Sequence, residues 1–236
     1  MNVPTTAPTT APTAPIELVC LDMAGTTVAD DGAVEGAFGR ALDDRRVAPG
    51  PERERMIAYV RDTMGASKIE VFRALFDTEA RARAANDAFE AAYDRAVREG
   101  GARPLPGATE CLGALRAGGL RIALTTGFPP RTRELLVDAL GWAPLVDLTL
   151  SPADAGRGRP FPDMILTAVL RLGASSVGAV AVAGDTRADM VSGRRAGASA
   201  VVGVLTGADD RIRLEAAGAT HVLDSVAALP ALLGLG

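Results

Sequence analysis

The sequence contains few of the residues on which several classes of protein depend. It has one lysine, one histidine and two cysteines among 236 residues, and aromatic side chains make up 4% of the chain. Because Cys20 and Cys111 cannot form a disulfide framework, we expect a reducing, cytoplasmic compartment. No apolar run approaches the roughly 20 residues of a membrane-spanning helix. The net charge is −4 and no basic block is present, which argues against nucleic acid or an anionic membrane as the main partner.

The remaining composition is that of a globular protein. Hydrophobic residues make up 48% of the chain and charged residues 23%, so a sizeable core can form. The length allows one large domain, or a main domain with a smaller insert. Residues 1–15 form a Thr/Pro/Ala tract without a charged side chain. We expect this tract to be a disordered tail, because it cannot bury enough surface to offset its chain entropy.

Short apolar runs alternate with helical patterns from Ile16 onward. Runs of this length that are rich in Val, Ile and Leu predict buried strands of a parallel sheet. The runs are 16–21, 120–124, 146–150, 180–183 and 200–204, and the helical patterns are 108–117, 131–140, 162–172 and 209–217. This alternation predicts an α/β fold with a doubly wound parallel sheet, which binds ligands outside the carboxyl ends of its strands.

The alternation stops between residues 32 and 103, where the sequence predicts helices alone. These helices are expected at about 34–46, 52–63, 68–76 and 78–99. Pro104 and Pro106 mark the return to the alternating pattern, because proline resists the continuation of a helix. We therefore expect an all-helical cap domain over residues 32–103, inserted into a core domain that consists of residues 16–31 and 104–236.

Polar side chains follow the predicted strands or lie in their connecting loops. Asp22 follows the first run, Thr126 follows the second, and Arg159 lies in a later loop. The fourth run ends in Gly-Asp-Thr-Arg-Ala-Asp, residues 184–189. Asp22 and Asp185 can hold Mg²⁺, which prefers oxygen ligands, while Thr126 and Arg159 can hold phosphoryl oxygens. With a metal ion beside a phosphoryl group, Asp22 becomes a candidate nucleophile that forms an aspartyl-phosphate.

The order and spacing of these segments resemble the haloacid dehalogenase (HAD) superfamily over nearly the whole chain from Ile16. The resemblance implies that Asp22 is the nucleophile and that Thr126 and Arg159 bind phosphate. It also implies a Mg²⁺ site next to them. The metal-binding residues would be Asp22, Ala24 through its backbone carbonyl, Asp185 and Asp189. The predicted helical insert is similar to the cap of this superfamily.

Ala24 narrows the expected chemistry. Most phosphatases and phosphomutases of the superfamily have an aspartate at this position, where it protonates the leaving oxygen. Alanine has no proton to give, and such general-acid help is worth on the order of 100-fold to 10,000-fold. The segment Asp-Met-Ala-Gly-Thr-Thr, residues 22–27, resembles instead the first motif of the phosphonoacetaldehyde hydrolase (phosphonatase) branch, which has alanine there and breaks a carbon–phosphorus (C–P) bond.

Lys68 supplies the second part of this resemblance. In the phosphonatase branch a cap lysine forms a Schiff base with the substrate aldehyde, which takes up the electrons of the C–P bond. The segment Met-Gly-Ala-Ser-Lys-Ile, residues 64–69, is similar to the one that carries it, and Lys68 is the only lysine among 25 basic residues. Arginine cannot replace it as an amine nucleophile, because arginine stays protonated. A solvated surface charge placed by chance is the alternative.

The residues around Lys68 bear on its charge. Ser67 and Glu70 form a capping-box pattern, which predicts a helix that begins at Lys68. The positive end of the helix dipole disfavours the ammonium form at this position, and Glu70 opposes that effect. Burial under the cap would lower the pKa of Lys68 further.

Three positions depart from the phosphonatase pattern and leave the exact substrate open. Val71, Phe128 and Gly32 stand where that branch has histidine, tyrosine and cysteine. The resemblance also implies that Met64, Gly127 and Phe128 contact the substrate. The sequence therefore predicts a Mg²⁺-dependent, phosphonatase-like hydrolase that acts on a phosphonoacetaldehyde-type substrate through an aspartyl-phosphate and a lysine Schiff base.

Other functions remain open on the sequence alone. A HAD small-molecule phosphatase, similar to phosphoglycolate phosphatase, would hydrolyse a phosphate monoester but lacks the acid at Ala24. A haloacid dehalogenase would not need the metal pair of Asp22 and Asp185. A catalytically silent binding module is disfavoured by the intact acidic residues. Each of the enzyme hypotheses predicts a small molecule as the partner. The sequence also allows a homodimer.

Overall fold

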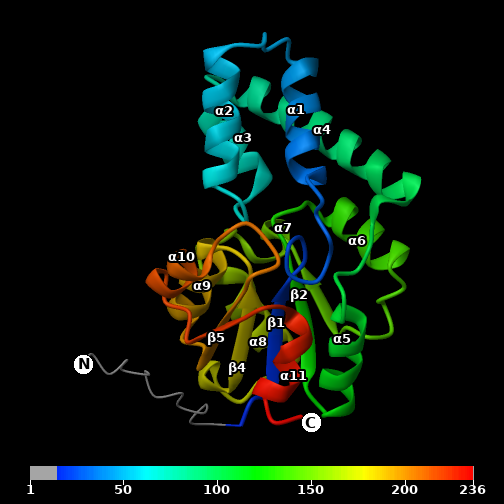
Figure 1. Cartoon of the computed structure of the whole chain (residues 1–236), viewed down its shortest axis with the longest axis vertical. Coiled ribbons are helices and arrows are strands. Elements are labelled where there is room, and N and C mark those ends of the chain that lie inside the picture. Colours follow the sequence, from blue (N-terminus) through cyan, green and yellow to red (C-terminus); the bar gives the residue numbers. More distant parts are fainter. Residues whose placement is uncertain (1–14, 236) are drawn as a thin grey trace, which may run out of the picture.

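The computed structural model describes residues 15–235, so the predicted tail lies outside the described residues except for Pro15. Its centre is a parallel sheet with helices on both faces, and a group of helices stands above one end of the strands (Figure 1). This arrangement confirms the predicted doubly wound α/β fold with a helical insert.

The sheet has six parallel strands in the order β3-β2-β1-β4-β5-β6. The strands are β1 (Leu18–Asp22), β2 (Arg121–Thr125), β3 (Leu148–Leu150), β4 (Val180–Gly184), β5 (Ala200–Val204) and β6 (His221–Leu223). The first five were predicted as apolar runs. The runs did not include β6, because three half-buried residues at a sheet edge are too few for a periodic pattern. The chain therefore places the end of β1, with Asp22, in the middle of the sheet.

Helices cover both faces of the sheet and shield its strands from solvent. They are α5 (Ala108–Ala117), α6 (Pro130–Ala139), α7 (Pro152–Ala155), α8 (Asp163–Leu172), α9 (Arg187–Ala196), α10 (Arg211–Ala216) and α11 (Leu229–Leu232). Alternate side chains of β1 enter two different apolar clusters. Val19 and Leu21 pack with residues of α5, while Leu18 and Cys20 pack with residues of α8 and α9. Burial on both faces explains why β1 is apolar throughout.

The insert between β1 and α5 consists of helices alone. They are α1 (Ala33–Asp44), α2 (Pro51–Asp62), α3 (Lys68–Leu75) and α4 (Glu79–Ala96), followed by a π-helical turn, η1 (Val97–Gly101). We call these helices the cap, and they agree with the four that the sequence predicts. The domain boundaries at residues 32 and 103 stay a prediction, because one apolar cluster runs from the cap into the sheet without a break.

Five aromatic rings join the cap to the sheet. Phe38, Phe72, Phe89 and Tyr93 come from the cap, and Phe128 comes from the loop after β2. The ring centroids of Tyr93 and Phe128 lie 4.5 Å apart, and those of Phe89 and Phe128 lie 6.3 Å apart. Contacts of this kind stabilise by about 0.5–1.5 kcal/mol beyond the burial of the rings. The cap is thus fixed above the carboxyl ends of β1 and β2.

Among the described helices, none is long and apolar enough to cross a membrane. The cytoplasmic compartment and the homodimer considered from the sequence remain predictions.

Candidate active site

A cavity of about 460 Å³ lies between the cap and the carboxyl ends of the strands. Most of the site residues that the sequence predicts line it. They are Asp22, Ala24, Met64, Lys68, Thr126, Gly127, Phe128, Arg159 and Asp185. Asp189 lies next to this set, where it forms an ion pair with Arg159. Segments from four parts of the chain therefore meet in one place, as the strand-end rule predicts.

The turn after β1 holds two acidic residues in position. The Thr27 hydroxyl donates a hydrogen bond to the carbonyl of Asp22 at 2.9 Å, and the Thr26 hydroxyl donates to Asp185 Oδ1 at 2.9 Å. Gly25 has a φ of +83°, and a Cβ added there would lie 2.5 Å from Asp185 Oδ2. A residue with a side chain cannot take this place without displacing Asp185.

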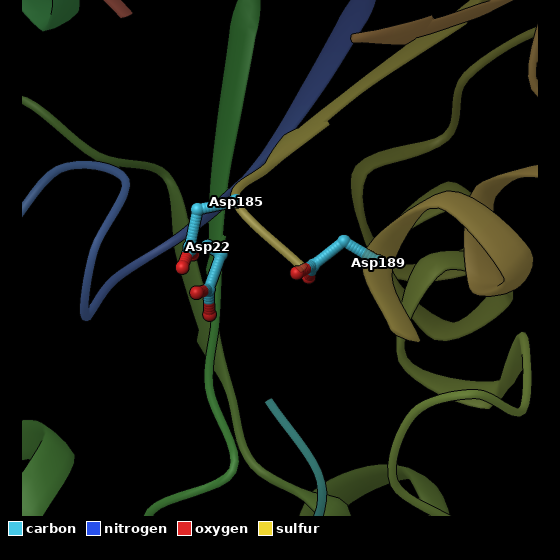
Figure 2. Close-up of side chains that lie close together, drawn as sticks. All are labelled: Asp22, Asp185 and Asp189. Atoms are coloured by element: carbon cyan, nitrogen blue, oxygen red, sulfur yellow. The ribbon is translucent and has the colours of Figure 1, made fainter. Parts of the chain in front are cut away.

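Three buried carboxylates gather at the floor of the cavity. Oxygens of Asp22, Asp185 and Asp189 all lie within 4.8 Å of one another. In Figure 2 the carboxyl groups of Asp22 and Asp185 lie side by side, and that of Asp189 points toward them from the first turn of α9. Arg159 Nη1 lies 2.7 Å from Asp22 Oδ1 and also pairs with Asp189. One guanidinium therefore pairs with two of the three acids.

The electrostatics of this cluster fit a divalent cation. Burial raises the pKa of Asp22 to about 6, with help from the charge of Asp189 and against the effect of Arg159. Burial, together with the charges of Asp22 and Asp189, raises the pKa of Asp185 well above its usual range. When all three carboxylates are ionised, Arg159 offsets only part of their negative charge. Carboxylate oxygens are the ligands that Mg²⁺ prefers, so the residues present fit this ion.

Lys68 is the first residue of α3 and reaches into the cavity from the cap. The residue is 6% exposed, and its Nζ lies 5.3 Å from the centroid of the Phe128 ring. Its backbone N–H donates to the carbonyl of Gly127 at 3.4 Å, which ties the start of α3 to the loop after β2. Burial and the charge of Arg159 lower the pKa of Lys68 to about 8, although Asp22 and Asp30 act in the opposite direction.

This pKa gives a measurable expectation, because the chain has one lysine. In the metal-free protein, the rate at which acetic anhydride acetylates Lys68 should rise with pH to a midpoint near 8, since only the neutral amine reacts. An unperturbed lysine would show a midpoint near 10.4. Mass analysis of the peptide that contains Lys68 separates this product from the acetylated N-terminus. A midpoint above 10 would mean that the amine is solvated rather than buried.

The predicted capping box at Ser67 is wrong in its hydrogen bonds, although the helix does begin at Lys68. In the described structure the Ser67 side chain caps no backbone N–H of α3. Glu70 instead pairs with Arg73, which also binds Glu79. These contacts hold Glu70 at the surface. The groups that raise the pKa of Lys68 are therefore carboxylates of the cavity and not Glu70.

The sequence analysis did not predict two parts of the site. The loop after β5 holds Asp185, because the N–H of Ala208 donates to Asp185 Oδ2 at 2.9 Å. The Thr206 hydroxyl of the same loop donates to the carbonyl of Gly25 at 2.7 Å. The strand-end rule applies to β5 as well and could have indicated this loop. Asp30, which also lines the cavity, belongs to no motif that the sequence shows.

Three glycines form the seam where the cap rests on the core. A Cβ on Gly65 would lie 2.5 Å from Thr186 Oγ1, and one on Gly127 would lie 2.5 Å from the carbonyl of Ala66. A Cβ on Gly158 would lie 3.1 Å from the Cβ of Ser67. The segment before Lys68 thus touches three core loops with no room between them, which fixes where Lys68 enters the cavity.

Gly65→Ala should therefore displace Lys68. Gly65 has a φ of +84° and no space for a methyl group, whereas Gly100 at the end of the cap has a φ of +87° and nothing within 4 Å. Both alanine variants should lose about 1–2 kcal/mol of stability from backbone strain. Only Gly65→Ala should also lose about tenfold or more in kcat/KM, because misplacement near the chemistry is costly. Equal activity of the two variants, measured beside their melting temperatures, would contradict this role of the seam.

Comparisons with known proteins agree with this geometry. The family model described as hydrolase, haloacid dehalogenase-like hydrolase, matches residues 16–197. A phosphonoacetaldehyde hydrolase of Nitratidesulfovibrio vulgaris is 30% identical over an alignment of 255 positions, which covers 90% of this chain and 88% of that protein. One from Parabacteroides distasonis is 33% identical over 156 residues, which cover 55% of this chain and 58% of that protein. The chain thus spans little more than half the length of the second relative.

Two further likenesses concern a phosphatase and a solved structure. The probable phosphatase IndB of Dickeya dadantii is 30% identical over 226 residues, which cover 92% of this chain and 95% of that protein. The crystal structure of a phosphonoacetaldehyde hydrolase like protein from Oleispira antarctica matches with a TM-score of 0.78 and 25% identity. That match covers 98% of this chain and 95% of the other.

Proposed function

The chain belongs to the family of haloacid dehalogenase-like hydrolases, and from that premise we propose that it cleaves the C–P bond of a phosphonoacetaldehyde-type substrate. The observation that carries this proposal is the buried amine of Lys68, which lines the same cavity as the carboxylate of Asp22. Ala24 also lines it, and its methyl group cannot protonate the oxygen of a leaving alcohol. This combination suits a reaction whose leaving carbanion needs an electron sink.

The proposed reaction has three stages. The neutral amine of Lys68 adds to the aldehyde carbon, and the hydroxyl of the adduct takes up a proton and leaves as water, which gives an iminium ion. Asp22 then attacks phosphorus, the C–P bond breaks, and its electron pair moves toward the iminium nitrogen to give an enamine and an aspartyl-phosphate. A proton adds to the enamine carbon, after which water hydrolyses both the imine and the aspartyl-phosphate. The products are acetaldehyde, inorganic phosphate and the free enzyme.

The remaining site residues prepare the phosphoryl group. Asp22, the carbonyl of Ala24 and Asp185 would hold Mg²⁺, with Asp189 in support. When bound, the ion supplies positive charge that neutralises the phosphoryl oxygens. Arg159, 2.7 Å from Asp22 Oδ1, and the Thr126 hydroxyl would orient the same oxygens, since a guanidinium matches phosphoryl geometry.

Borohydride trapping tests the proposal. Sodium borohydride added during turnover of phosphonoacetaldehyde should reduce the imine and leave a stable adduct on Lys68, which peptide mass analysis locates. The same treatment with an acyclic phosphate ester that has no carbonyl group should leave Lys68 unmodified. The absence of an adduct with phosphonoacetaldehyde, under conditions where phosphate is released, would remove the Schiff base from the mechanism.

Hydrolysis of a small phosphate monoester, as by phosphoglycolate phosphatase, is the second candidate. The likeness to the probable phosphatase of Dickeya dadantii supports it. It requires a general acid other than residue 24, since Ala24 cannot act as one. Release of phosphate from phosphoglycolate without any Lys68 adduct would favour this candidate.

Removal of the metal should stop the reaction. Treatment with EDTA is expected to abolish turnover, and added Mg²⁺ should restore it, because the three carboxylates at the cavity floor repel an incoming phosphoryl group unless a cation offsets them. Calorimetry should show Mg²⁺ binding that Asp185→Asn weakens strongly. Full activity after exhaustive chelation would favour the dehalogenase-like alternative.

A further inference from the structure

A carboxylate outside the acidic cluster shares the cavity with Lys68. Asp30 lies between β1 and α1, is half-buried, and lines the cavity. Its Oδ1 accepts a hydrogen bond from the backbone N–H of Val34 at 2.9 Å, which anchors the side chain at the start of α1. The charges of Asp30 and Lys68 are close enough to affect each other's pKa. Asp30 and Lys68 therefore line one cavity, and the charge of each acts on the other.

The other carboxylates that line the cavity are paired with arginine, exposed, or part of the acidic cluster. Asp31 pairs with Arg103, and Glu35 binds Arg61 through two hydrogen bonds of 2.6 and 2.8 Å. Asp62 is exposed at the rim. Asp22 and Asp185 belong to the cluster proposed for Mg²⁺. Asp62 has no arginine ion pair either, but it is exposed, so within residues 15–235 Asp30 is the half-buried cavity carboxylate that has neither an arginine partner nor a place in that cluster.

Imine chemistry at Lys68 needs such a group. The hydroxyl of the first addition product leaves as water only when it takes up a proton, and the reverse reaction needs a base. Val71, three residues after Lys68 on α3, is apolar and is 4% exposed within the apolar cluster. The one histidine, His221, lies in the edge strand β6. Neither can serve Lys68.

We propose that Asp30 is the general acid and base for formation and hydrolysis of the Lys68 imine. The proposal rests on the function proposed above. The amine adds to the aldehyde carbon, and transfer of a proton from nitrogen to oxygen gives a carbinolamine. Protonated Asp30 then gives its proton to the hydroxyl, the C–O bond breaks, water leaves, and the nitrogen lone pair forms the C=N bond of the iminium. In hydrolysis, the Asp30 carboxylate takes a proton from the water that adds to that carbon.

The surroundings of Asp30 favour this role. Burial raises the pKa of Asp30, as do the charges of Asp31 and Glu35, while Lys68 and the Val34 N–H oppose the rise. A carboxyl group whose pKa is raised carries its proton nearer to neutral pH. On the α4 side, burial and the charges of Asp30 and Asp22 raise the pKa of the Tyr93 phenol. Tyr93 therefore stays protonated and does not take over the role of base.

The test compares Asp30→Asn with Asp31→Asn. Asparagine at position 30 keeps an oxygen for the Val34 N–H but cannot give up a proton as a carboxyl does, and the control changes the neighbouring exposed acid. With phosphonoacetaldehyde and borohydride, Asp30→Asn should form the Lys68 adduct at least about 100-fold more slowly than the wild type and the control. Hydrolysis of p-nitrophenyl phosphate, whose leaving group needs neither imine nor acid, should change little, and Asp30→Glu should recover a large part of the trapping rate.

Four results would overturn the assignment. Equal trapping rates in Asp30→Asn and Asp31→Asn would remove Asp30 from imine chemistry and leave the proposed function intact. Equally slow trapping in Asp30→Glu and Asp30→Asn, or a parallel loss on p-nitrophenyl phosphate, would mean that Asp30 acts only through the structure of α1. Failure of the wild type to form any adduct would refute the proposed function itself. If Asp30→Asn then lost hydrolysis of alkyl phosphates, Asp30 would be the acid of a phosphatase.

Discussion

Asparagine in place of Asp22 is expected to lower turnover of a phosphonate substrate by at least about four orders of magnitude, as is usual when a covalent nucleophile is removed. The amide of asparagine is not a nucleophile toward phosphorus and cannot form the acyl-phosphate. The fold should persist, because asparagine has the shape of aspartate and Arg159 keeps its pair with Asp189. A melting temperature within a few degrees of the wild type would separate lost chemistry from lost structure.

The aspartyl-phosphate itself can be observed. Acid quenching during turnover, followed by mass analysis of the peptide that contains β1, should show a phosphorylated Asp22 in the wild type and none in Asp22→Asn. A variant that keeps more than a few per cent of the wild-type rate would exclude Asp22 as the nucleophile. It would also require a different explanation for the burial of this carboxylate beside Arg159.

The second large effect is expected at Lys68. Lys68→Arg keeps the positive charge but has no nucleophilic amine, so C–P cleavage should slow by at least about 1,000-fold, or about 4 kcal/mol in the activation free energy. Lys68→Met, which fills the buried space beside Phe128 without a charge, should lose as much. Hydrolysis of p-nitrophenyl phosphate should fall far less in both variants, because its leaving group needs neither an imine nor an acid.

Ala24→Asp is the complementary variant. A carboxyl group two residues after the nucleophile would supply the acid that alkyl phosphates require, so their hydrolysis should rise while C–P cleavage does not. Rates on phosphonoacetaldehyde, an alkyl phosphate and p-nitrophenyl phosphate, measured on all three variants, give the comparison. Equal losses on every substrate in Lys68→Arg and Lys68→Met would show that the lysine only positions the cap or binds phosphate, and the phosphatase candidate would then be preferred.

The place of the candidate site was largely predictable because several of its residues lie at strand ends. Asp22 ends β1, Thr126 and Asp185 directly follow β2 and β4, and the carboxyl ends of neighbouring parallel strands meet at one edge of a sheet. The apolar runs give the strands, and the strands bring the polar residues together. Lys68 was predictable for another reason, because a single lysine in an arginine-rich chain stands out from the surface charge.

Features that depend on three-dimensional contacts could not be predicted in this way. The Ser67 capping box failed because Arg73 lies within reach of both Glu70 and Glu79, which no short motif reveals. Asp30 has no distinguishing neighbours in the sequence, and its place in one cavity with Lys68 depends on how the cap rests on the core. That placement in turn depends on the fit of Gly65, Gly127 and Gly158 against residues distant in the chain.

The central position of β1 has a consequence for the order in which the protein is made. β1 leaves the ribosome first, yet it pairs with β2 and β4, which begin at Arg121 and Val180. At about 5–20 residues per second, this apolar strand waits several seconds or more for either neighbour. The cap helices, between Ala33 and Ala96, emerge before both and contact one another locally. We therefore expect the cap to collapse onto its aromatic side chains while β1 still lacks both of its partner strands.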